Sequence, residues 1–497
     1  MTKTLKRAST LGYALALTAT LLLAAFLLFD GLGTRPFDSW DEARHGQSAY
    51  EMLQSGDWIV TTYLGEPDYW NLKPPLSMWG DAIGFAVFGY NPLGLRIASS
   101  GLMFVTYLLM AWYVHRRYGR LESLVVLWLF CACRVVYYLH FARTGQADGY
   151  STAFFLISLM ALMDSERDVR SLYVCALCFG LSFLARSWHA FLIPGVCLVT
   201  LVVTGRIRKL KPKHYLALIG LGLLPILPWA VLRYARDGWT FFRGMLEYDL
   251  LKRSGEAIEG HVESPWYYFQ YLAQYPTAIL AACLCVAAAA RRLIRRARPR
   301  FDETAVAVAV LLPLVLFSAA ETKIDRYAFP TLAALLLGGG VAAGRLTRDA
   351  AALWRRQKRL PACALSLGLA ACVAVAGTGV AENVRTISRL RANDPYQNAL
   401  GSVINAQSAA PDGGKLRVYT LMENGWPEWR PSDILLTSIL CGDVNGIERL
   451  NGGMEPFLSD PGAWIVTSNV FVTDELRAAC VCHYDDGFVS VLENKGE

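Results

Sequence analysis

The sequence predicts a mainly α-helical protein that crosses a membrane many times, and three observations lead to this fold class. Of the 497 residues, 54% are hydrophobic and only 18% are charged. The apolar residues are gathered in long runs with few charges inside them, which is the composition of an integral membrane protein. The basic residues form short clusters between those runs, so the net charge of +7 indicates membrane topology and not nucleic-acid binding.

Eleven apolar segments are candidates for transmembrane helices, because a helix needs about 20 residues to cross the hydrocarbon core. They fall near residues 11–29, 93–114, 121–139, 150–163, 171–185, 190–204, 214–233, 269–290, 303–319, 328–344 and 361–380. The first is expected to be a retained helix and not a removable signal peptide, since no small-residue cleavage site follows it.

Clusters of lysine and arginine orient these predicted helices. They precede the first span and follow the second, sixth, eighth and tenth spans, so with eleven spans they all fall on one side. The positive-inside rule makes that side cytoplasmic. The polar segments on the opposite face are then 30–92, 140–149, 186–189, 234–268, 320–327 and 381–497.

The chain is expected to divide into a transmembrane domain, residues 1–380, and a small α/β domain, residues 381–497. Within the tail, residues 416–421, 464–467 and 488–492 have the composition of short strands, and residues 474–480 that of a helix. About 100 residues is a normal size for a domain. The tail contains neither a glycine-rich phosphate loop nor a metal-binding motif.

Nine of the twelve cysteines lie in or beside apolar spans, where they serve as small hydrophobic residues. The other three, Cys441, Cys480 and Cys482, lie in the tail. In an oxidising compartment Cys441 could pair with Cys480 or Cys482. Cys480 and Cys482 are too close to pair with each other, and they lack further zinc ligands.

The segment after the first span is too long to be a simple connector, and loops of that size are usually functional. Ser39 and Glu42 form a capping box, so a helix is expected to start here and to run to about Gln54. Its three-and-four spacing places an acid and basic groups on one face. These residues are Asp41, Arg44, His45 and Ser48. The alternative is that Asp41 only complements the helix dipole and that Glu42 only caps the helix.

A second feature of this loop is Lys73, which two prolines follow and two aromatic residues precede at Tyr69 and Trp70. Because Pro74 and Pro75 restrict the backbone, Leu72 and Lys73 are expected in an extended or turn conformation that holds the lysine rigidly. The alternative is an interfacial lysine whose ammonium group reaches toward water.

Three shorter polar segments on the same face contain further ionisable groups, which are costly at membrane depth and therefore indicate function. Residues 141–148, 184–189 and 321–330 supply Arg143, Asp148, Arg186, Lys323, Arg326 and Tyr327. The alternative for the first segment is a simple loop ion pair between Arg143 and Asp148.

Taken in order, these motifs resemble the GT-C superfamily of glycosyltransferases, in the branch of the bacterial aminoarabinose transferases and the protein O-mannosyltransferases. The resemblance covers about residues 10–345. It rests on Asp41-Glu42-Ala43-Arg44, Gly56-Asp57-Trp58, Lys73-Pro74-Pro75, residues 143–148, Pro228-Trp229, residues 264–268 and residues 323–330. Each motif alone is weak, but their combined order and spacing are specific.

The resemblance implies an inverting transfer of a sugar from a polyprenyl-phosphate donor, at the periplasmic face of the bacterial inner membrane. The acceptor would be lipid A, another glycolipid, a polysaccharide or a protein, and nucleic acid is not an expected partner. The implied catalytic residues are Asp41 and Asp148. The resemblance also implies that Arg44, Lys73 and Tyr327 contact the donor phosphate. We further expect Arg143, Arg186, Lys323 and Arg326 to bind substrate, supported by Glu42, His45 and His261.

The chain departs from the aminoarabinose branch at two positions. These departures leave open which sugar is transferred and whether a divalent cation is bound. That branch usually has a glutamate where this chain has Leu72, and its Thr-Lys-Gly motif corresponds to Ala185-Arg186-Ser187.

The chemistry supports the same residues, because a departing polyprenyl phosphate is already a stable anion and needs no general acid. The reaction needs a base for the acceptor and cations for the phosphate. Asp41 supplies the base, and the candidate cations are Arg44, Lys73, Lys323 and Arg326.

Two other functions are compatible with the sequence. A glycan ligase or polymerase would use similar groups to move a whole oligosaccharide. A transporter or flippase is less consistent with the chain, which has no inverted repeat and carries its polar residues on one face.

The predicted topology can be tested by cysteine labelling with an impermeant reagent. Gly65→Cys and Gly413→Cys should be labelled in intact spheroplasts, whereas Lys211→Cys and Arg356→Cys should require permeabilisation. We expect this result because all five clusters of basic residues fall on the side that the positive-inside rule makes cytoplasmic. The opposite orientation would place all five clusters in the periplasm. If the reagent failed to label Gly65→Cys but labelled Lys211→Cys in intact spheroplasts, the predicted orientation would be wrong.

Overall fold

The computed structural model describes residues 3–38, 40–138, 140–256, 262–389, 394–408, 415–442 and 446–496, and most of them are helical. The chain forms two compact units. The first unit consists of Met1–Asp30, Tyr69–Ser77 and Ile97–Arg389, and the second of Gly31–Asp68, Met78–Arg96 and Leu390–Glu497. The second unit thus contains parts of the first loop together with the tail. The domain boundary near residue 380 stays a prediction.

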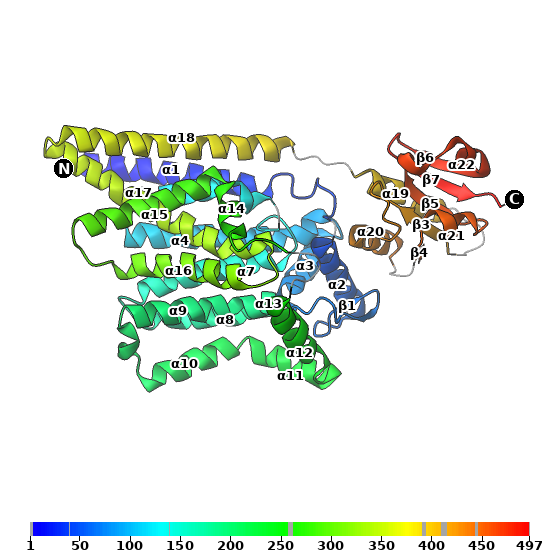
Figure 1. Ribbon diagram of the computed structural model, residues 1–497, viewed down its shortest axis with the longest axis horizontal. Coiled ribbons are helices and arrows are strands. Elements are labelled where there is room, and N and C mark those ends of the chain that lie inside the picture. The colour runs from blue at the N-terminus through cyan, green and yellow to red at the C-terminus, as the bar shows by residue number, and fades with distance from the viewer. Residues whose placement is uncertain are drawn as a thin grey trace. The chain divides into compact units, whose positions relative to one another are not determined.

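The first unit is a bundle of helices (Figure 1). Its long helices are α1 (Lys3–Phe29), α4 (Pro92–Arg117), α5 (Arg120–Ala132), α7 (Ala147–Asp164), α8 (Ser171–Arg186), α9 (Leu192–Val203), α10 (Pro212–Leu223), α11 (Ile226–Asp237), α15 (Pro276–Ile294), α16 (Phe301–Ala319), α17 (Phe329–Arg355) and α18 (Arg359–Arg389). Short helical segments connect them: α6 (Arg134–Tyr137), η1 (Ser187–Phe191), η2 (Arg206–Lys209), α12 (Thr240–Gly244), the π-helix η3 (Met245–Lys252), α13 (Arg253–Gly255), α14 (Tyr267–Ala273) and η4 (Asp325–Ala328).

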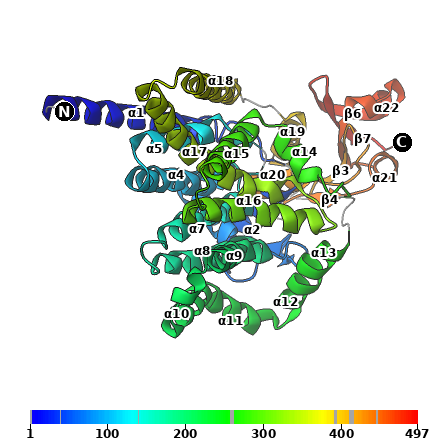
Figure 2. The ribbon, with the colours of Figure 1, turned by 60° about the vertical axis from the view of Figure 1, so that its left-hand side comes forward.

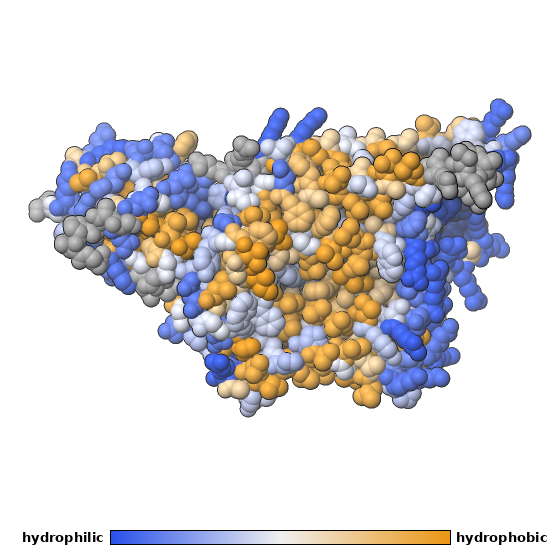
Figure 3. Space-filling view, turned by 180° about the vertical axis from the view of Figure 1, so that it is seen from behind, coloured by the Kyte–Doolittle hydropathy of each residue, from blue (hydrophilic) through white to orange (hydrophobic). Residues whose placement is uncertain are grey.

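The helices of this unit make the protein a multi-pass membrane protein. In the described residues, seven helices are long and apolar enough to cross a membrane, or eight if the bent pair α10–α11 is one span. Each of the eleven predicted segments contains at least one helix, but α5 and α7 fall outside these limits, and α8 and α9 count as one stretch. The count of eleven therefore stays a prediction. Figure 3 shows a broad hydrophobic surface over the helices.

Helix α17 is the centre of the bundle, since 94% of its most apolar window is buried. Figure 2 shows it among its neighbours α5, α15 and α16. Three consecutive glycines make the close packing possible. A Cβ at Gly339 would lie 2.8 Å from the Ala281 Cα of α15, and one at Gly340 would lie 2.7 Å from the Val126 Cα of α5. Small residues at helix contacts are typical of membrane bundles, where backbones must approach closely.

The second unit contains a five-stranded sheet in the order β4-β3-β5-β7-β6. The strands are β3 (Arg417–Leu421), β4 (Glu448–Leu450), β5 (Trp464–Ser468), β6 (Cys480–Asp485) and β7 (Val489–Asn494). β3 runs parallel to β4 and β5, and β7 runs antiparallel to β5 and β6. Strands predicted at 416–421, 464–467 and 488–492 correspond to β3, β5 and β7, so the small α/β domain is confirmed, whereas β4 and β6 were missed.

The remaining elements of this unit are α2 (Asp41–Ser55), β1 (Thr62–Tyr63), β2 (Glu66–Pro67), α3 (Leu76–Phe88), α19 (Pro395–Ser408), α20 (Pro431–Cys441), α21 (Met454–Leu458), η5 (Asn469–Phe471) and α22 (Asp474–Ala479). α22 is the helix expected at 474–480. α2 packs on α20, where Leu435 of α20 leaves no room for a Cβ at Gly46. The first loop and the tail therefore share one apolar core.

All twelve cysteines are free thiols, so the disulfide considered for Cys441 is not formed. Cys441 ends α20, and its Sγ lies 3.9 Å from the Gln407 side-chain oxygen. Cys480 is buried at the start of β6. Each thiol is accommodated by the packing around its own element.

A buried ion pair between Arg96 of α4 and Glu42 of α2 connects the two ends of the first loop. The Arg96 Nε and Nη2 atoms donate to the two Glu42 oxygens at 2.8 and 2.7 Å, and both side chains are almost completely buried. The same guanidinium donates to three backbone oxygens, at distances of 2.7 to 3.1 Å. These belong to Leu32, Arg35 and Pro36.

The start of α2 differs from the predicted capping box in its N-cap residue, and Glu42 has a second role. α2 starts at Asp41 and ends at Ser55, close to the predicted bounds, but its N-cap residue is Trp40, with no side-chain cap. Ser39 lies outside the described residues. The Glu42 carboxylate accepts from Arg96 and from the Asp38 backbone N–H. Charge neutralisation of a buried arginine is worth more than one capping bond, which explains the outcome.

We predict that Arg96→Met destabilises the protein by about 3–5 kcal/mol, because it leaves the Glu42 carboxylate buried without its cation. The matched control is Arg35→Met, since Arg35 pairs with Asp38 at a site where both side chains are about one third exposed. That change should cost about 1 kcal/mol or less. Thermal unfolding in detergent measures both, and equal losses would show that the buried pair has no special role.

Candidate active site

The centre of the first unit's polar site is an ion pair between Asp148 and Arg186. Asp148 stands in the first turn of α7, and Arg186 is the last residue of α8. The guanidinium and the carboxylate are in direct contact, and both side chains are more than nine-tenths buried. The loop ion pair between Arg143 and Asp148, the alternative raised from sequence, is not formed, because Arg186 takes its place.

Arg143 is directed toward the end of α1. Its Nη1 donates to the Leu27 oxygen at 2.7 Å, and its Nη2 donates to the Asp30 oxygen at 2.6 Å. The last carbonyls of a helix lack intrahelical partners, so a buried arginine stabilises them well. This contact gives Arg143 a structural role, and its predicted contact with substrate stays a prediction.

A narrow pocket opens beside the Asp148–Arg186 pair. Arg186, Arg326, His189 and Tyr327 line it together with Phe317 and the hydroxyls of Ser151, Thr152 and Ser182. The Arg186 guanidinium lies 5.4 Å from the Tyr327 ring centre, and the His189 ring lies 4.5 Å from it. Two arginines, a phenol and an imidazole in one pocket are suited to an anionic group such as a phosphate.

His189 belongs to this pocket although it was not among the predicted site residues. It lies in η1, and the centre of its ring lies 5.6 Å from that of the stacked Phe317 ring of α16. Its position three residues after Arg186, in a polar interruption of an apolar hairpin, was the signal that sequence reasoning could have used.

The backbone beside Arg186 has an unusual conformation. Ser187 has φ 50° and ψ −124°, a region that favours glycine. Its hydroxyl donates to the Asp249 carboxylate at 2.7 Å, and the next residue, Trp188, donates its indole N–H to the Met245 oxygen at 2.8 Å. Both acceptors lie in the π-helix η3. The η1 turn is thus held by η3, and sequence reasoning missed Asp249.

Lys323 and Tyr327 belong to the segment that leads into α17. Tyr327 is buried in η4 and faces the pocket. The Lys323 ammonium is buried and donates to the Ala320 oxygen at 2.8 Å. Tyr327 and Arg326 therefore lie at the pocket, whereas Lys323 contacts Ala320, the residue that follows α16.

Lys73 also lies in the first unit, directly after Leu72. The turn that the two prolines predict is present, since the Lys73 N–H donates to the Asn71 oxygen at 2.8 Å. Lys73 is half-buried. Leu72 packs against Gly244, where an added Cβ would lie 3.1 Å from its side chain.

The residues at the start of α2 belong to the second unit. Asp41 is half-buried, and His45 is completely buried. The Arg44 guanidinium makes two bonds to Asp68, at 2.9 and 3.2 Å, and lies 3.9 Å above the Tyr63 ring. Burial raises the pKa of Tyr63 to about 12, against the opposing effect of Arg44. Asp68 was missed from the sequence, and His261 lies outside the described residues.

A divalent cation does not fit the residues that the structure describes. Among them, no group of three or more histidine, cysteine, aspartate or glutamate side chains is placed to hold a metal ion. Position 72 carries an apolar side chain that cannot be a ligand.

Part of the chain matches a known family, and several known proteins are similar to it over most of its length. Residues 72–231 match the family described as dolichyl-phosphate-mannose-protein mannosyltransferase. An undecaprenyl phosphate-alpha-4-amino-4-deoxy-L-arabinose arabinosyl transferase from Pseudomonas paraeruginosa is 32% identical over 71% of this chain and 64% of its own length. The corresponding Pseudomonas aeruginosa protein is 31% identical over 65% of this chain and 59% of its own. The chain thus matches less than two thirds of these relatives' lengths.

Solved structures show the same fold. ArnT from Cupriavidus metallidurans, crystallised with undecaprenyl phosphate, aligns over 96% of this chain and 97% of its own with a TM-score of 0.70 and 17% identity. An Archaeoglobus fulgidus oligosaccharyltransferase aligns over 93% of this chain and 70% of its own, with a TM-score of 0.53 and 10% identity.

The conformation of Ser187 leads to a prediction, because the resembling branch has glycine at this position. Ser187→Ala and Ser187→Gly both remove the hydrogen bond to Asp249. Only alanine has a Cβ, so only the alanine variant retains the steric strain of the positive φ at this position. The alanine variant should therefore be less stable than the glycine variant by about 1–3 kcal/mol. Thermal unfolding of the two purified variants measures this difference, and equal unfolding temperatures would contradict the prediction.

Proposed function

We propose that this chain is an inverting glycosyltransferase of the GT-C type that moves a sugar from a polyprenyl-phosphate donor to a periplasmic acceptor. The observation that carries the proposal is the pocket of Arg186, Arg326, His189 and Tyr327 beside the Asp148–Arg186 pair. The names of the relatives support undecaprenyl phosphate as the carrier and 4-amino-4-deoxy-L-arabinose as the first sugar to test. The acceptor is lipid A, another glycolipid, a polysaccharide or a protein.

Several cations are proposed to hold the donor phosphate. Arg186 and Arg326 line the pocket, and their planar guanidinium groups suit two-point contact with phosphate oxygens. Asp148 fixes the orientation of Arg186, while the Tyr327 hydroxyl can donate one further bond. Arg44 and Lys73 are proposed as additional phosphate contacts, with Asp68 fixing the orientation of Arg44. Cations in such positions would stabilise the negative charge that grows on the departing phosphate.

Asp41 is proposed as the base that takes the proton of the acceptor. The neighbouring acid, Glu42, accepts from Arg96 and from the Asp38 N–H, so it is committed to the structure. Asp41 is half-buried at the helix start, and a carboxylate is a group that can accept a proton as a general base.

The active site is proposed to face the periplasm from the bacterial inner membrane, because the basic clusters favour the cytoplasm for the opposite ends of the helices. This orientation explains the need for a lipid-linked donor, since nucleotide sugars are made in the cytoplasm.

The decisive experiment compares Asp41→Asn with the matched control Asp38→Asn in a transfer assay with undecaprenyl-phosphate aminoarabinose and lipid A. Asn keeps the shape of the side chain but cannot accept the proton, so the rate should fall by about a hundredfold or more. Asp38 lies three residues away and only pairs with Arg35 at the surface, so its variant should keep the normal rate. Near-normal turnover in Asp41→Asn would disprove the assignment.

Oligosaccharide transfer is the second candidate, favoured by the fold shared with the Archaeoglobus oligosaccharyltransferase. Mass spectrometry of the acceptor distinguishes the two, because it measures whether one sugar or a whole glycan has been added. A flippase would change no covalent bond in either substrate.

A further inference from the structure

A second polar site lies at the end of the first unit where α15 ends and α16 begins. In Figure 1 this connection lies at the same end as the α9–α10 and α17–α18 connections and the N-terminus. A pocket between α15, α16 and α17 is lined there by six arginines and two carboxylates. The arginines are Arg291, Arg292, Arg295, Arg300, Arg345 and Arg348, and the acids are Glu303 and Asp349. Positive charge therefore exceeds negative charge threefold.

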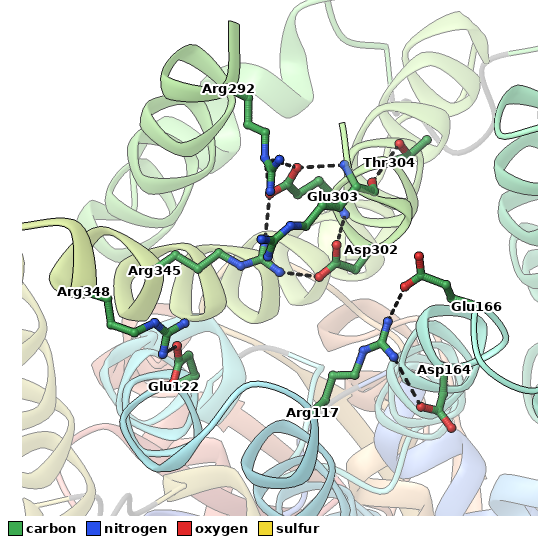
Figure 4. Close-up of polar contacts among 11 residues, drawn as sticks. Arg117, Glu122, Asp164, Glu166, Arg292, Asp302, Glu303, Thr304, Arg345 and Arg348 are labelled. Atoms are coloured by element: carbon green, nitrogen blue, oxygen red, sulfur yellow. Dashed lines mark hydrogen bonds and ion pairs between the residues drawn. The ribbon is translucent and has the colours of Figure 1, made fainter. Parts of the chain in front are cut away.

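The acids at this end are already neutralised by other arginines (Figure 4). Arg345 contacts Asp302 and donates to Glu303 at 2.7 Å, and Arg292 reaches the same glutamate at 3.0 Å. The further pairs are Arg291 with Asp349, Arg348 with Glu122, and Arg117 with Glu166. These pairs stabilise the pocket walls, and they leave no carboxylate of the pocket available to the remaining cations.

Three arginines, Arg295, Arg298 and Arg300, are in excess over the carboxylates of this region. All three are exposed, and within the described residues no carboxylate is paired with them. A topology signal requires only that charges lie near the membrane. Here the three arginines line two pockets. Arg295 and Arg300 line the first pocket, and Arg298 lines a second, adjoining pocket that shares Arg300 and Arg345 with the first.

Exposed apolar side chains adjoin these cations. Leu293 is 80% exposed and Ile294 is 82% exposed, and they directly precede Arg295. The first pocket is also lined by Ala288 and Leu346. Cations beside exposed apolar residues match the boundary between a phospholipid headgroup and its acyl chains. A soluble anion would contact the arginines alone.

We propose that this end of α15, α16 and α17 binds the headgroup of an anionic phospholipid that carries two phosphates, with its acyl chains along Leu293 and Ile294. Basic pockets between transmembrane helices on the cytoplasmic side are suited to such headgroups. Two adjoining arginine pockets that share two side chains provide one place for each phosphate. The lipid would lie in the leaflet opposite the proposed active site, so the inference is independent of the transfer reaction.

The test uses the purified full chain in nanodiscs of phosphatidylcholine, with or without a cardiolipin or phosphatidylglycerol fraction. Native mass spectrometry counts the retained lipid. Cardiolipin should be retained in preference to both other lipids, and Arg295→Gln/Arg298→Gln/Arg300→Gln should weaken its binding about tenfold or more. The matched control, Arg243→Gln/Arg385→Gln/Arg389→Gln, removes the same number of exposed charges elsewhere in the chain and should bind cardiolipin normally.

Three outcomes would overturn the proposal. The first is unchanged cardiolipin retention in the triple variant, and the second is an equal loss in the control, which would indicate net charge alone. The third is displacement of the lipid by inorganic pyrophosphate at submillimolar concentration, which would indicate a soluble anion as the ligand. Circular dichroism of the triple variant should match the unaltered chain, because the three arginines make no ion pair that the fold requires.

Discussion

The cost of burying charge is the constraint on which the rest of this structure depends. An arginine or a carboxylate away from water needs a partner of opposite charge and hydrogen bonds for its remaining atoms. Arg96 obtains both from Glu42 and from backbone oxygens of the first loop. Asp148 and Arg186 satisfy each other at the ends of two neighbouring helices. Each pair therefore connects segments that are distant in the chain.

The same constraint explains where irregular backbone is found. Long regular helices satisfy their own backbone groups, as a membrane requires. The 3₁₀ turns η1 and η4 and the π-helix η3 lie where the chain reverses, and η1 and η4 contribute the pocket residues. Side chains take over the missing bonds there, as Ser187 and Trp188 do for η1. The departures from regular structure thus coincide with the proposed active site, where the strain at Ser187 holds Arg186 in place.

The fold class and the order of the polar segments could be predicted because they depend on local properties. Apolar runs and basic clusters are readable without knowledge of any contact, and each predicted span contains at least one helix. The choice of partners could not be predicted in this way. Asp148 pairs with Arg186 and not with Arg143, and Glu42 pairs with Arg96 in addition to its bond near the helix start. In both cases the true partner lies 38 or more residues away, beyond the range of a spacing argument.

The sequence by itself determined a multi-pass helical protein with a small α/β tail, and it identified most of the ionisable residues that the site requires. These follow from hydropathy and strand composition, which each segment carries alone. Only the tertiary structure decided which cations line the pocket, that His189 joins them, and that the first loop packs with the tail in one core. Such choices depend on which helix ends meet, because a buried charge is stabilised by whatever group the fold brings within a few ångströms of it.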